Sequence, residues 1–198
     1  VAQWLQAYEA KQPVPSAAAM TEADGKCSRN KLNAAWLAQG KKPIGYKAGL
    51  TSAAMQKRFQ TDKPVWGVLY EGALLANRST VPAAFGARPM FEADMLVRVS
   101  SSAINRATTP LQVLNNIDRI VPFIELPDLV VENPAQLDGA AVEAMNVGAR
   151  MGVMGNAMPV PQFRAERYAL LNALQSMQVD ITDQSGARLG GGRGGDLM

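Results

Sequence analysis

Hydrophobic and polar residues alternate most regularly along residues 90–98, in the order Met-Phe-Glu-Ala-Asp-Met-Leu-Val-Arg. Successive side chains of a β-strand point to opposite faces, so this alternation predicts a strand with one apolar face and one face that carries two adjacent carboxylates. The apolar face would hold Phe91, Ala93, Met95 and Val97, and the other face Glu92, Asp94, Leu96 and Arg98. Neighbouring carboxylates repel one another unless water, a base or a cation lies between them, and hard divalent cations prefer oxygen ligands. The pattern therefore fits either an acidic strand face in solvent or the edge of a metal site.

The remaining pattern predicts helices and short strands in mixed order. Helices are expected over residues 1–11, 21–39, 53–59, 109–116, 140–146 and 163–174, and strands near residues 44, 66, 91, 120, 150 and 178, with a hairpin over residues 177–189. Residues 12–20 contain two prolines, which block helix continuation, so we expect an extended linker there. This order predicts a helical N-terminal region, residues 1–40, followed by one main domain.

The helix expected from residue 21 has clear signals at both ends. Thr21 and Asp24 have the spacing of an N-terminal capping pair, and Gly40 is a typical helix terminator. Leu32, Ala35 and Trp36 are expected to form its buried side, with Cys27 as a further candidate. As the single cysteine, Cys27 cannot form an intrachain disulfide, and we expect it to be an inert packing residue rather than a nucleophile.

Composition narrows the function classes. Hydrophobic residues make up 47% and charged residues 19% of the 198-residue chain, as in ordinary globular proteins. The net charge of +3 comes without a basic run, which gives little reason to expect nucleic-acid binding. The chain contains no histidine, so Ser-His-Asp chemistry, Cys-His chemistry and His-ligated zinc are excluded within it. Acid-base catalysis would have to use Asp, Glu, Lys, Tyr or Cys.

The sequence does not determine the cellular location of the protein. No apolar run approaches the roughly 20 residues that span a bilayer, so we expect a soluble protein without a membrane partner. The chain begins at Val1, and we interpret this as removal of a secretory signal or an expression tag. A removed signal would indicate a periplasmic or secreted protein.

Lys47 lies in a predicted strand, between Gly45 and Gly49. Glycines allow close backbone approach, so this lysine would be well placed to meet a ligand, and a partly desolvated amine can act as a base. The alternative is a surface lysine on an edge strand. Thr51 or Ser52 would cap the short helix that follows.

Glu125 lies inside a hydrophobic run, where an ionised carboxylate is costly unless it is paired or binds a metal. It is therefore the best single candidate for a buried functional acid. The alternative is a structural ion pair with Arg119 or Arg150. Asp128, next to Pro127, is expected to be a turn residue.

Two glycine-rich segments were considered as anion sites. Residues 148–155 do not have the strand, GxGxxG and helix order of a nucleotide-binding turn, so that function is not predicted. The segment Gly190-Gly191-Gly192-Arg193-Gly194-Gly195 is expected to be flexible, and would bind an anion through backbone N–H groups and Arg193 or form a disordered end.

Four short motifs together resemble a known family. They are Gly45-Tyr46-Lys47-Ala48-Gly49-Leu50-Thr51-Ser52, Pro64-Val65-Trp66-Gly67, Glu92-Ala93-Asp94 and Pro122-Phe123-Ile124-Glu125. In this order and at these separations they resemble the 2-keto-4-pentenoate hydratase group of the fumarylacetoacetate hydrolase superfamily. The resemblance covers about residues 20–198. It implies an α+β fold with a rolled mixed β core over residues 41–198, flanking helices and a helical N-terminal region.

The resemblance also implies a site. Its metal ligands would be Glu92, Asp94 and Glu125, binding Mg²⁺ or Mn²⁺, and its catalytic or substrate-binding lysine would be Lys47. Thr51, Ser52 and Arg193 are expected to bind substrate. Three carboxylates around one divalent ion leave open coordination positions for the carboxylate and keto oxygens of a 2-oxo acid.

The implied reaction is hydration of a 2-hydroxy-2,4-dienoate or 2-oxo-4-enoate to a 4-hydroxy-2-oxo acid. Val65 stands where hydratases of the group often carry an Asp. This difference favours a metal-dependent 2-oxo acid decarboxylase as the alternative function. A catalytically inactive 2-oxo acid binding protein is a further alternative. Family members continue beyond the position of Met198, so the core is expected to lack its C-terminal part. The resemblance also implies a homo-oligomer and a cytoplasmic location.

Overall fold

The computed structural model describes residues 1–16 and 19–197. Contacts divide the chain into two compact units. Unit 1 contains Val1–Glu92 and Glu125–Val153, and unit 2 contains Ala93–Ile124 and Met154–Met198. The domain boundary predicted at residues 40 and 41 is a different division and stays a prediction. No described helix is long and apolar enough to cross a membrane.

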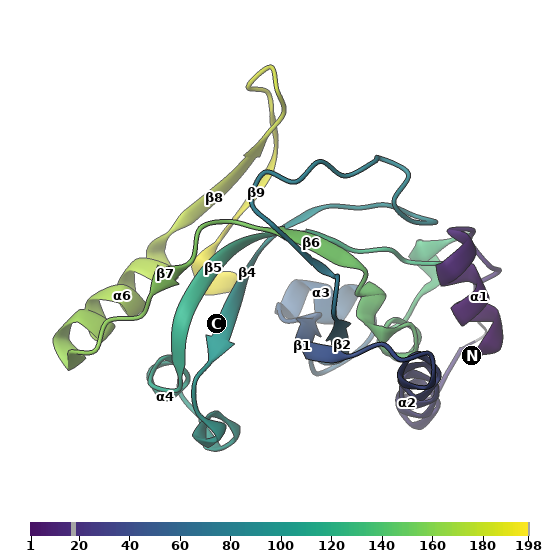
Figure 1. Cartoon of the computed structure of the whole chain (residues 1–198), viewed down its shortest axis with the longest axis horizontal. Coiled ribbons are helices and arrows are strands. Elements are labelled where there is room, and N and C mark those ends of the chain that lie inside the picture. The colour runs from purple at the N-terminus through teal and green to yellow at the C-terminus, as the bar shows by residue number, and fades with distance from the viewer. Residues whose placement is uncertain (17–18, 198) are drawn as a thin grey trace. The chain divides into compact units, whose positions relative to one another are not determined.

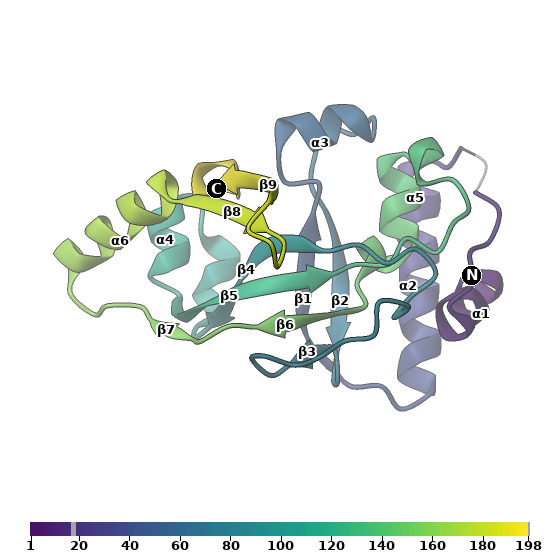
Figure 2. The same ribbon diagram turned by 90° about the horizontal axis from the view of Figure 1, so that it is seen from above.

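Unit 1 combines helices with two pairs of strands (Figure 1). Its helices are α1 (Ala2–Ala10), α2 (Glu22–Ala38), α3 (Ala53–Arg58) and α5 (Gly139–Ala144), with short 3-10 turns η2 (Pro134–Gln136) and η3 (Asn146–Gly148). Strands β1 (Pro43–Gly49) and β2 (Val65–Tyr70) pair antiparallel, and β3 (Leu74–Leu75) pairs parallel with β6 (Met151–Met154). Helices α2 and α5 lie side by side, as Figure 2 also shows. Mixed strand directions with flanking helices confirm the predicted α+β class.

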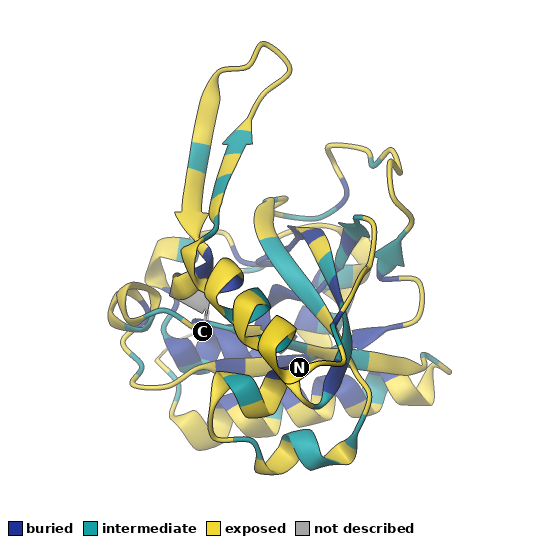
Figure 3. Ribbon diagram, turned by 90° about the vertical axis from the view of Figure 1, so that its left-hand side faces the viewer, coloured by how far each residue is buried: buried dark blue, intermediate teal, exposed yellow. Residues whose placement is uncertain are grey.

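Unit 2 is built around a long strand, β5 (Ile117–Leu126), which pairs with β4 (Glu92–Val99) on one side and with β7 (Met158–Pro159). Its helices are η1 (Ser102–Arg106), α4 (Pro110–Leu114), α6 (Arg164–Ser176) and η4 (Gly194–Leu197). The hairpin of β8 (Gln178–Thr182) and β9 (Arg188–Arg193) is mostly exposed (Figure 3). A cluster around Leu114, Ile117, Ile120, Val160 and Leu174 forms the core of this unit.

Local signals fixed most helix ends as predicted. Thr21 and Asp24 form a capping box at the start of α2, and Gly40, with φ of 83°, follows its end. Ser52 accepts a hydrogen bond from the Met55 N–H at the start of α3 (3.3 Å), and Pro110 opens α4. The linker predicted over residues 12–20 lies partly outside the described residues, and its Val14 bridges Val131.

Two local predictions were wrong. Cys27 is exposed, because nine positions along α2 place it half a turn of the helix away from the buried Trp36. The glycine-rich segment 190–195 is ordered, with β9 running through Arg193 and η4 following it, because its glycines pair with the β8 backbone. The strand expected over residues 90–98 is confirmed as β4, and Phe91, just before it, and Val97 are 53% and 45% exposed.

Candidate active site

Lys47 and Glu125 form a buried ion pair in unit 1. The Lys47 Nζ lies 2.6 Å from Oε1 of Glu125, and the two side chains are 10% and 4% exposed. Lys47 comes from the middle of β1 and Glu125 from the end of β5. Lys47 is therefore not the surface lysine of the alternative interpretation. Glu125 forms its ion pair with Lys47, and Arg150 forms one with Asp128.

A backbone carbonyl holds the Lys47 ammonium from a second direction. The Nζ donates a hydrogen bond to the carbonyl oxygen of Val147 (2.9 Å), which lies in η3. An ammonium carries three N–H donors, so these two partners leave one donor for a substrate oxygen. Two fixed partners restrict the flexible lysine chain to one direction, which a group that transfers or donates a proton requires.

The carbonyl of Val147 is held by an unusual backbone conformation. Asn146, Val147 and Gly148 have φ values of 57°, 58° and 61°, so three successive residues are left-handed. For a β-branched residue such as Val147 this conformation is strained, at a cost of about 1–3 kcal/mol. Such strain persists only where the surrounding structure enforces it, and it is concentrated at functional sites. In this chain the left-handed conformation points the carbonyl oxygen of Val147 at the Lys47 ammonium.

The side chain of Asn146 enforces this conformation. Its Oδ1 accepts the Val68 N–H (2.8 Å) and its Nδ2 donates to the Val68 carbonyl (2.9 Å), so the amide pairs with β2 as a strand residue would. The same Oδ1 accepts a bond from Nδ2 of Asn33 in α2 (3.1 Å). Asn146 is fully buried, with 0% exposure. A buried amide with all these bonds is a rigid anchor for the turn.

A polar network in α2 supports this anchor. Asn33 also donates to the Arg29 carbonyl (2.8 Å) and accepts the Tyr70 hydroxyl (2.5 Å) through its Oδ1. The Arg29 guanidinium pairs with Glu143 of α5 and lies 3.7 Å from the centre of the Trp66 ring. Burial raises the pKa of Tyr70, which keeps its hydroxyl protonated as a donor. The site is thus backed by buried groups from α2, α5 and β2.

Two motif glycines make room for the strained turn. A Cβ atom on Gly49 would lie 2.4 Å from Cγ1 of Val147, and one on Gly67 would lie 2.4 Å from the Asn146 carbonyl oxygen. Gly67 is also the residue opposite Lys47 in the β1–β2 register. The glycines are therefore required by the turn at residues 146–148 rather than by their own φ angles.

Replacing Gly49 with Ala should lower the free energy of unfolding by about 1–3 kcal/mol, because the new methyl group overlaps the stiff Val147 side chain. Gly45 on the same strand is the matched control, since the nearest atom to its Cβ position, Cδ1 of Leu69, lies 4.0 Å away. Urea unfolding measures the free energy of unfolding of Gly49→Ala and of Gly45→Ala. Equal losses in the two variants would show that general strand propensity, and not the turn, requires Gly49.

The remaining predicted site residues differ in exposure and in the contacts that they make. Ser52 caps α3, Thr51 is exposed, and Arg193 is exposed at the end of β9. Glu92 is exposed, and the half-buried Asp94 accepts the N–H of Met95 through Oδ1 (2.7 Å). Among the described residues, no three acidic side chains are gathered closely enough to hold a metal ion. Carboxylate oxygens are ligands that Mg²⁺ prefers, and the assignment of Glu92, Asp94 and Glu125 as metal ligands stays a prediction.

Asp128 has a role that the prediction of a turn residue missed. It is 1% exposed, accepts the N–H groups of Ala87 (3.0 Å) and Arg88 (2.6 Å), and pairs with Nη1 of Arg150 (3.1 Å). Arg150 in turn donates to the carbonyl oxygens of Phe85 and Tyr8, both at 2.8 Å. Asp128 lies in an apolar run as Glu125 does, so the same argument from burial cost would have found it.

Comparison with known proteins supports the motif-based resemblance. No protein-family model matches the chain. The chain is 28% identical over 122 residues to 2-keto-4-pentenoate hydratase 1 of Dechloromonas aromatica (strain RCB), covering 61% of this chain and 46% of that protein. It is 24% identical over 154 residues to 4-oxalocrotonate decarboxylase of Pseudomonas putida, covering 78% and 58%. The chain spans about half the length of the curated hydratases it matches.

A solved structure shares the fold. The 4-oxalocrotonate decarboxylase from Pseudomonas putida G7, complexed with magnesium and adipate, superposes with a TM-score of 0.78 at 21% identity, covering 99% of this chain and 75% of that one. The resemblance stated from the motifs is therefore confirmed: the chain is similar in sequence to 2-keto-4-pentenoate hydratases and shares its fold with 4-oxalocrotonate decarboxylase.

Proposed function

We propose that the chain is a divalent-metal-dependent hydratase that adds water to a 2-hydroxy-2,4-dienoate, or to the 2-oxo-enoate formed from it, to give a 4-hydroxy-2-oxo acid. The observation that carries this proposal is the buried pair of Lys47 and Glu125. Both residues belong to the motifs that resemble the hydratase group, and the relatives named above include hydratases. The substrate is a small 2-oxo acid.

Lys47 supplies the proton-handling group in this proposal. From the dienoate, the enol proton leaves the C2 oxygen and a proton is gained at C5, which gives the 2-oxo-3-enoate. Water then places a hydroxyl group on C4 and a proton on C3, by way of an enolate whose charge lies on the C2 oxygen. The ammonium of Lys47 can donate its remaining N–H to that oxygen or deliver the proton at C3. The Glu125 carboxylate neutralises the ammonium and fixes its direction, and the Val147 carbonyl fixes it from the other side.

The metal part of the proposal rests on the motifs. Solved relatives of the same fold are complexed with magnesium or calcium. In this chain Glu92, Asp94 and Glu125 would hold Mg²⁺ or Mn²⁺, and a bound cation would stabilise the enolate charge. Glu125 would then serve both as a metal ligand and as the ion-pair partner of Lys47.

Decarboxylation is the second candidate, and Val65 favours it. Val65 is 6% exposed at the start of β2, where it pairs with Gly49 and packs in the core of unit 1. No carboxylate is therefore available at the position where hydratases of the group often carry an Asp. Decarboxylation requires the same stabilisation of an enolate without an additional group to assist water.

Turnover of two substrates distinguishes the candidates. With Mg²⁺ present, the proposal predicts loss of ultraviolet absorbance from 2-hydroxypenta-2,4-dienoate without release of CO₂. Release of CO₂ from 4-oxalocrotonate, with no reaction of the dienoate, would establish the decarboxylase instead. Ligand-induced thermal stabilisation with neither reaction would contradict both activities and leave a 2-oxo acid binding protein.

The proposed metal ligands have their own test. Glu92→Gln should weaken Mg²⁺ or Mn²⁺ binding about tenfold or more, as measured by titration calorimetry. Even residues that only hydrogen-bond to metal ligands usually change metal affinity by that factor when they are replaced. Its fold should be unaffected, since Glu92 is exposed. Glu71→Gln is the matched control, because Glu71 is an exposed glutamate paired with Lys42. Full metal affinity and turnover in Glu92→Gln would rule out Glu92 as a ligand.

A further inference from the structure

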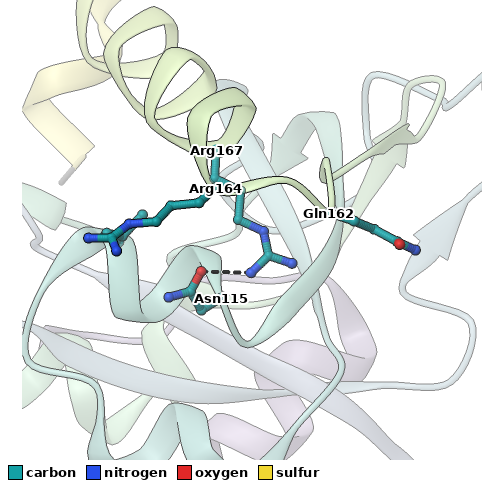
Figure 4. A pocket seen from close by; sticks show the side chains of 5 residues that line it. Asn115, Gln162, Arg164 and Arg167 are labelled. Carbon is teal, nitrogen blue, oxygen red and sulfur yellow. Dashed lines mark hydrogen bonds between the residues drawn. The ribbon is translucent and has the colours of Figure 1, made fainter.

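A cavity within unit 2 carries a positive charge that no lining carboxylate neutralises. It has a volume of about 390 Å³ and is lined by Leu111 and Asn115, from the α4 region, and by Gln162, Arg164 and Arg167 at the start of α6. Figure 4 shows the Arg167 side chain reaching Asn115, while the Arg164 side chain extends from the start of α6 in a different direction. No acidic residue lines the cavity, and neither arginine forms an ion pair with a described carboxylate.

Arg167 is held in place by neutral groups only. Its Nε donates to the Pro161 carbonyl (2.7 Å) and its Nη1 donates to Oδ1 of Asn115 (2.6 Å). These bonds fix the planar guanidinium, and its Nη2 makes no hydrogen bond to any described residue. Because Asn115 uses its oxygen to accept from Arg167, its amide N–H groups remain available as donors. A fixed guanidinium beside free amide donors matches the oxygen atoms of an anion.

Arg164 adds a second charge to the same cavity. Its Nη2 donates to the Tyr168 hydroxyl (3.3 Å), and its guanidinium carbon lies 5.6 Å from the centre of the Tyr168 ring. The hydrogen bond to Tyr168 raises the pKa of Arg164, so the group stays charged. Glu166, the acidic residue of the same helical turn, does not line the cavity. The positive end of the α6 dipole adds to this charge.

We propose that this cavity binds a small oxyanion with two negative charges, such as a phosphate group or a dicarboxylate, between Arg164, Arg167 and Asn115. Two guanidinium groups with no carboxylate among the lining residues match a charge of −2. The single apolar lining residue, Leu111, gives little surface for an uncharged ligand. The site is independent of Lys47 and of the proposed reaction, so either proposal can fail without the other.

Titration of the full chain tests the proposal. Inorganic phosphate and succinate are added separately at constant ionic strength, and the NMR signals of the Asn115 side-chain amide and the Arg167 Nε–H are followed. We expect saturable shifts of both signals with at least one of the two anions. Tighter binding of phosphate would identify a tetrahedral ligand, and tighter binding of succinate a dicarboxylate.

Arginine variants distinguish binding in the cavity from general attraction of the anion to a positively charged protein. Arg167→Gln and Arg164→Gln should each weaken binding about tenfold or more, since each removes charged hydrogen-bond donors to the anion. Arg167→Lys, which keeps the charge but loses the planar fork, should also weaken it. Arg106→Gln, at an exposed arginine of η1 that does not line the cavity, removes the same charge and should leave affinity unchanged. Shifts that do not saturate, or equal losses in Arg106→Gln and Arg167→Gln, would overturn the proposal.

Discussion

Replacing Lys47 with Met should lower turnover of the dienoate by about 10²- to 10⁴-fold, the usual contribution of a positioned acid-base group. The same change should lower the free energy of unfolding by about 3–5 kcal/mol, because it removes the ammonium that neutralises a carboxylate with only 4% exposure. Steady-state kinetics and urea unfolding measure the two effects. Both losses are large because both side chains of the pair are desolvated.

A second variant separates these two effects. The double substitution Lys47→Met with Glu125→Gln removes both charges, so most of the lost stability should return while turnover stays low. Lys42→Met is the matched control, because the Lys42 side chain is 78% exposed, and it should change neither quantity. Recovery of turnover in the double variant, or near-normal turnover in Lys47→Met, would show that Lys47 only supports the fold.

Asn146→Ala should cost about 3–5 kcal/mol of unfolding free energy. The change removes three hydrogen bonds and leaves the N–H and carbonyl of Val68 facing a buried methyl group, and each unsatisfied group costs about 1–3 kcal/mol. Alanine also tolerates the left-handed conformation less well than asparagine. Turnover should fall as well, since the Val147 carbonyl that orients Lys47 would no longer be held in place.

The control for Asn146 is an asparagine without buried partners. Asn172 is exposed on α6, and Asn172→Ala should change stability by less than about 0.5 kcal/mol, as surface substitutions usually do. Guanidinium or urea unfolding at constant pH compares the two variants. A loss below 1 kcal/mol in Asn146→Ala would mean that the left-handed turn at residues 146–148 is maintained by other groups.

Much of the local structure followed from the sequence. The caps at Thr21 and Ser52 and the proline at the start of α4 act through residues a few positions away, so a single sequence shows them. Glu125 was recognised because an acid in an apolar run has a cost that must be offset by some partner. Which partner it takes depends on the fold, and for this reason Lys47 was found as a candidate but not as its ion-pair partner.

The support around the site was not predictable in this way. Lys47 and Val147 lie 100 residues apart in the chain, and their contact depends on a backbone conformation that valine rarely adopts. Asn146 carries no charge and belongs to no pattern of period two or 3.6, so nothing in the sequence separated it from a surface asparagine. The neighbouring Pro127 predicts a turn residue at Asp128. The apolar residues around Asp128 instead indicate a buried, paired carboxylate, which is what the structure shows.

The discontinuous composition of unit 1 has a consequence for its synthesis. The first 92 residues form this unit together with residues 125–153, and Val142, Met145 and Val147 from the second segment belong to the same hydrophobic cluster as Trp4 and Phe59. A ribosome therefore exposes β1 and β2 well before it has made the turn that packs against them. We expect the nascent N-terminal segment to remain open, and to need protection from aggregation, until residue 153 has left the exit tunnel.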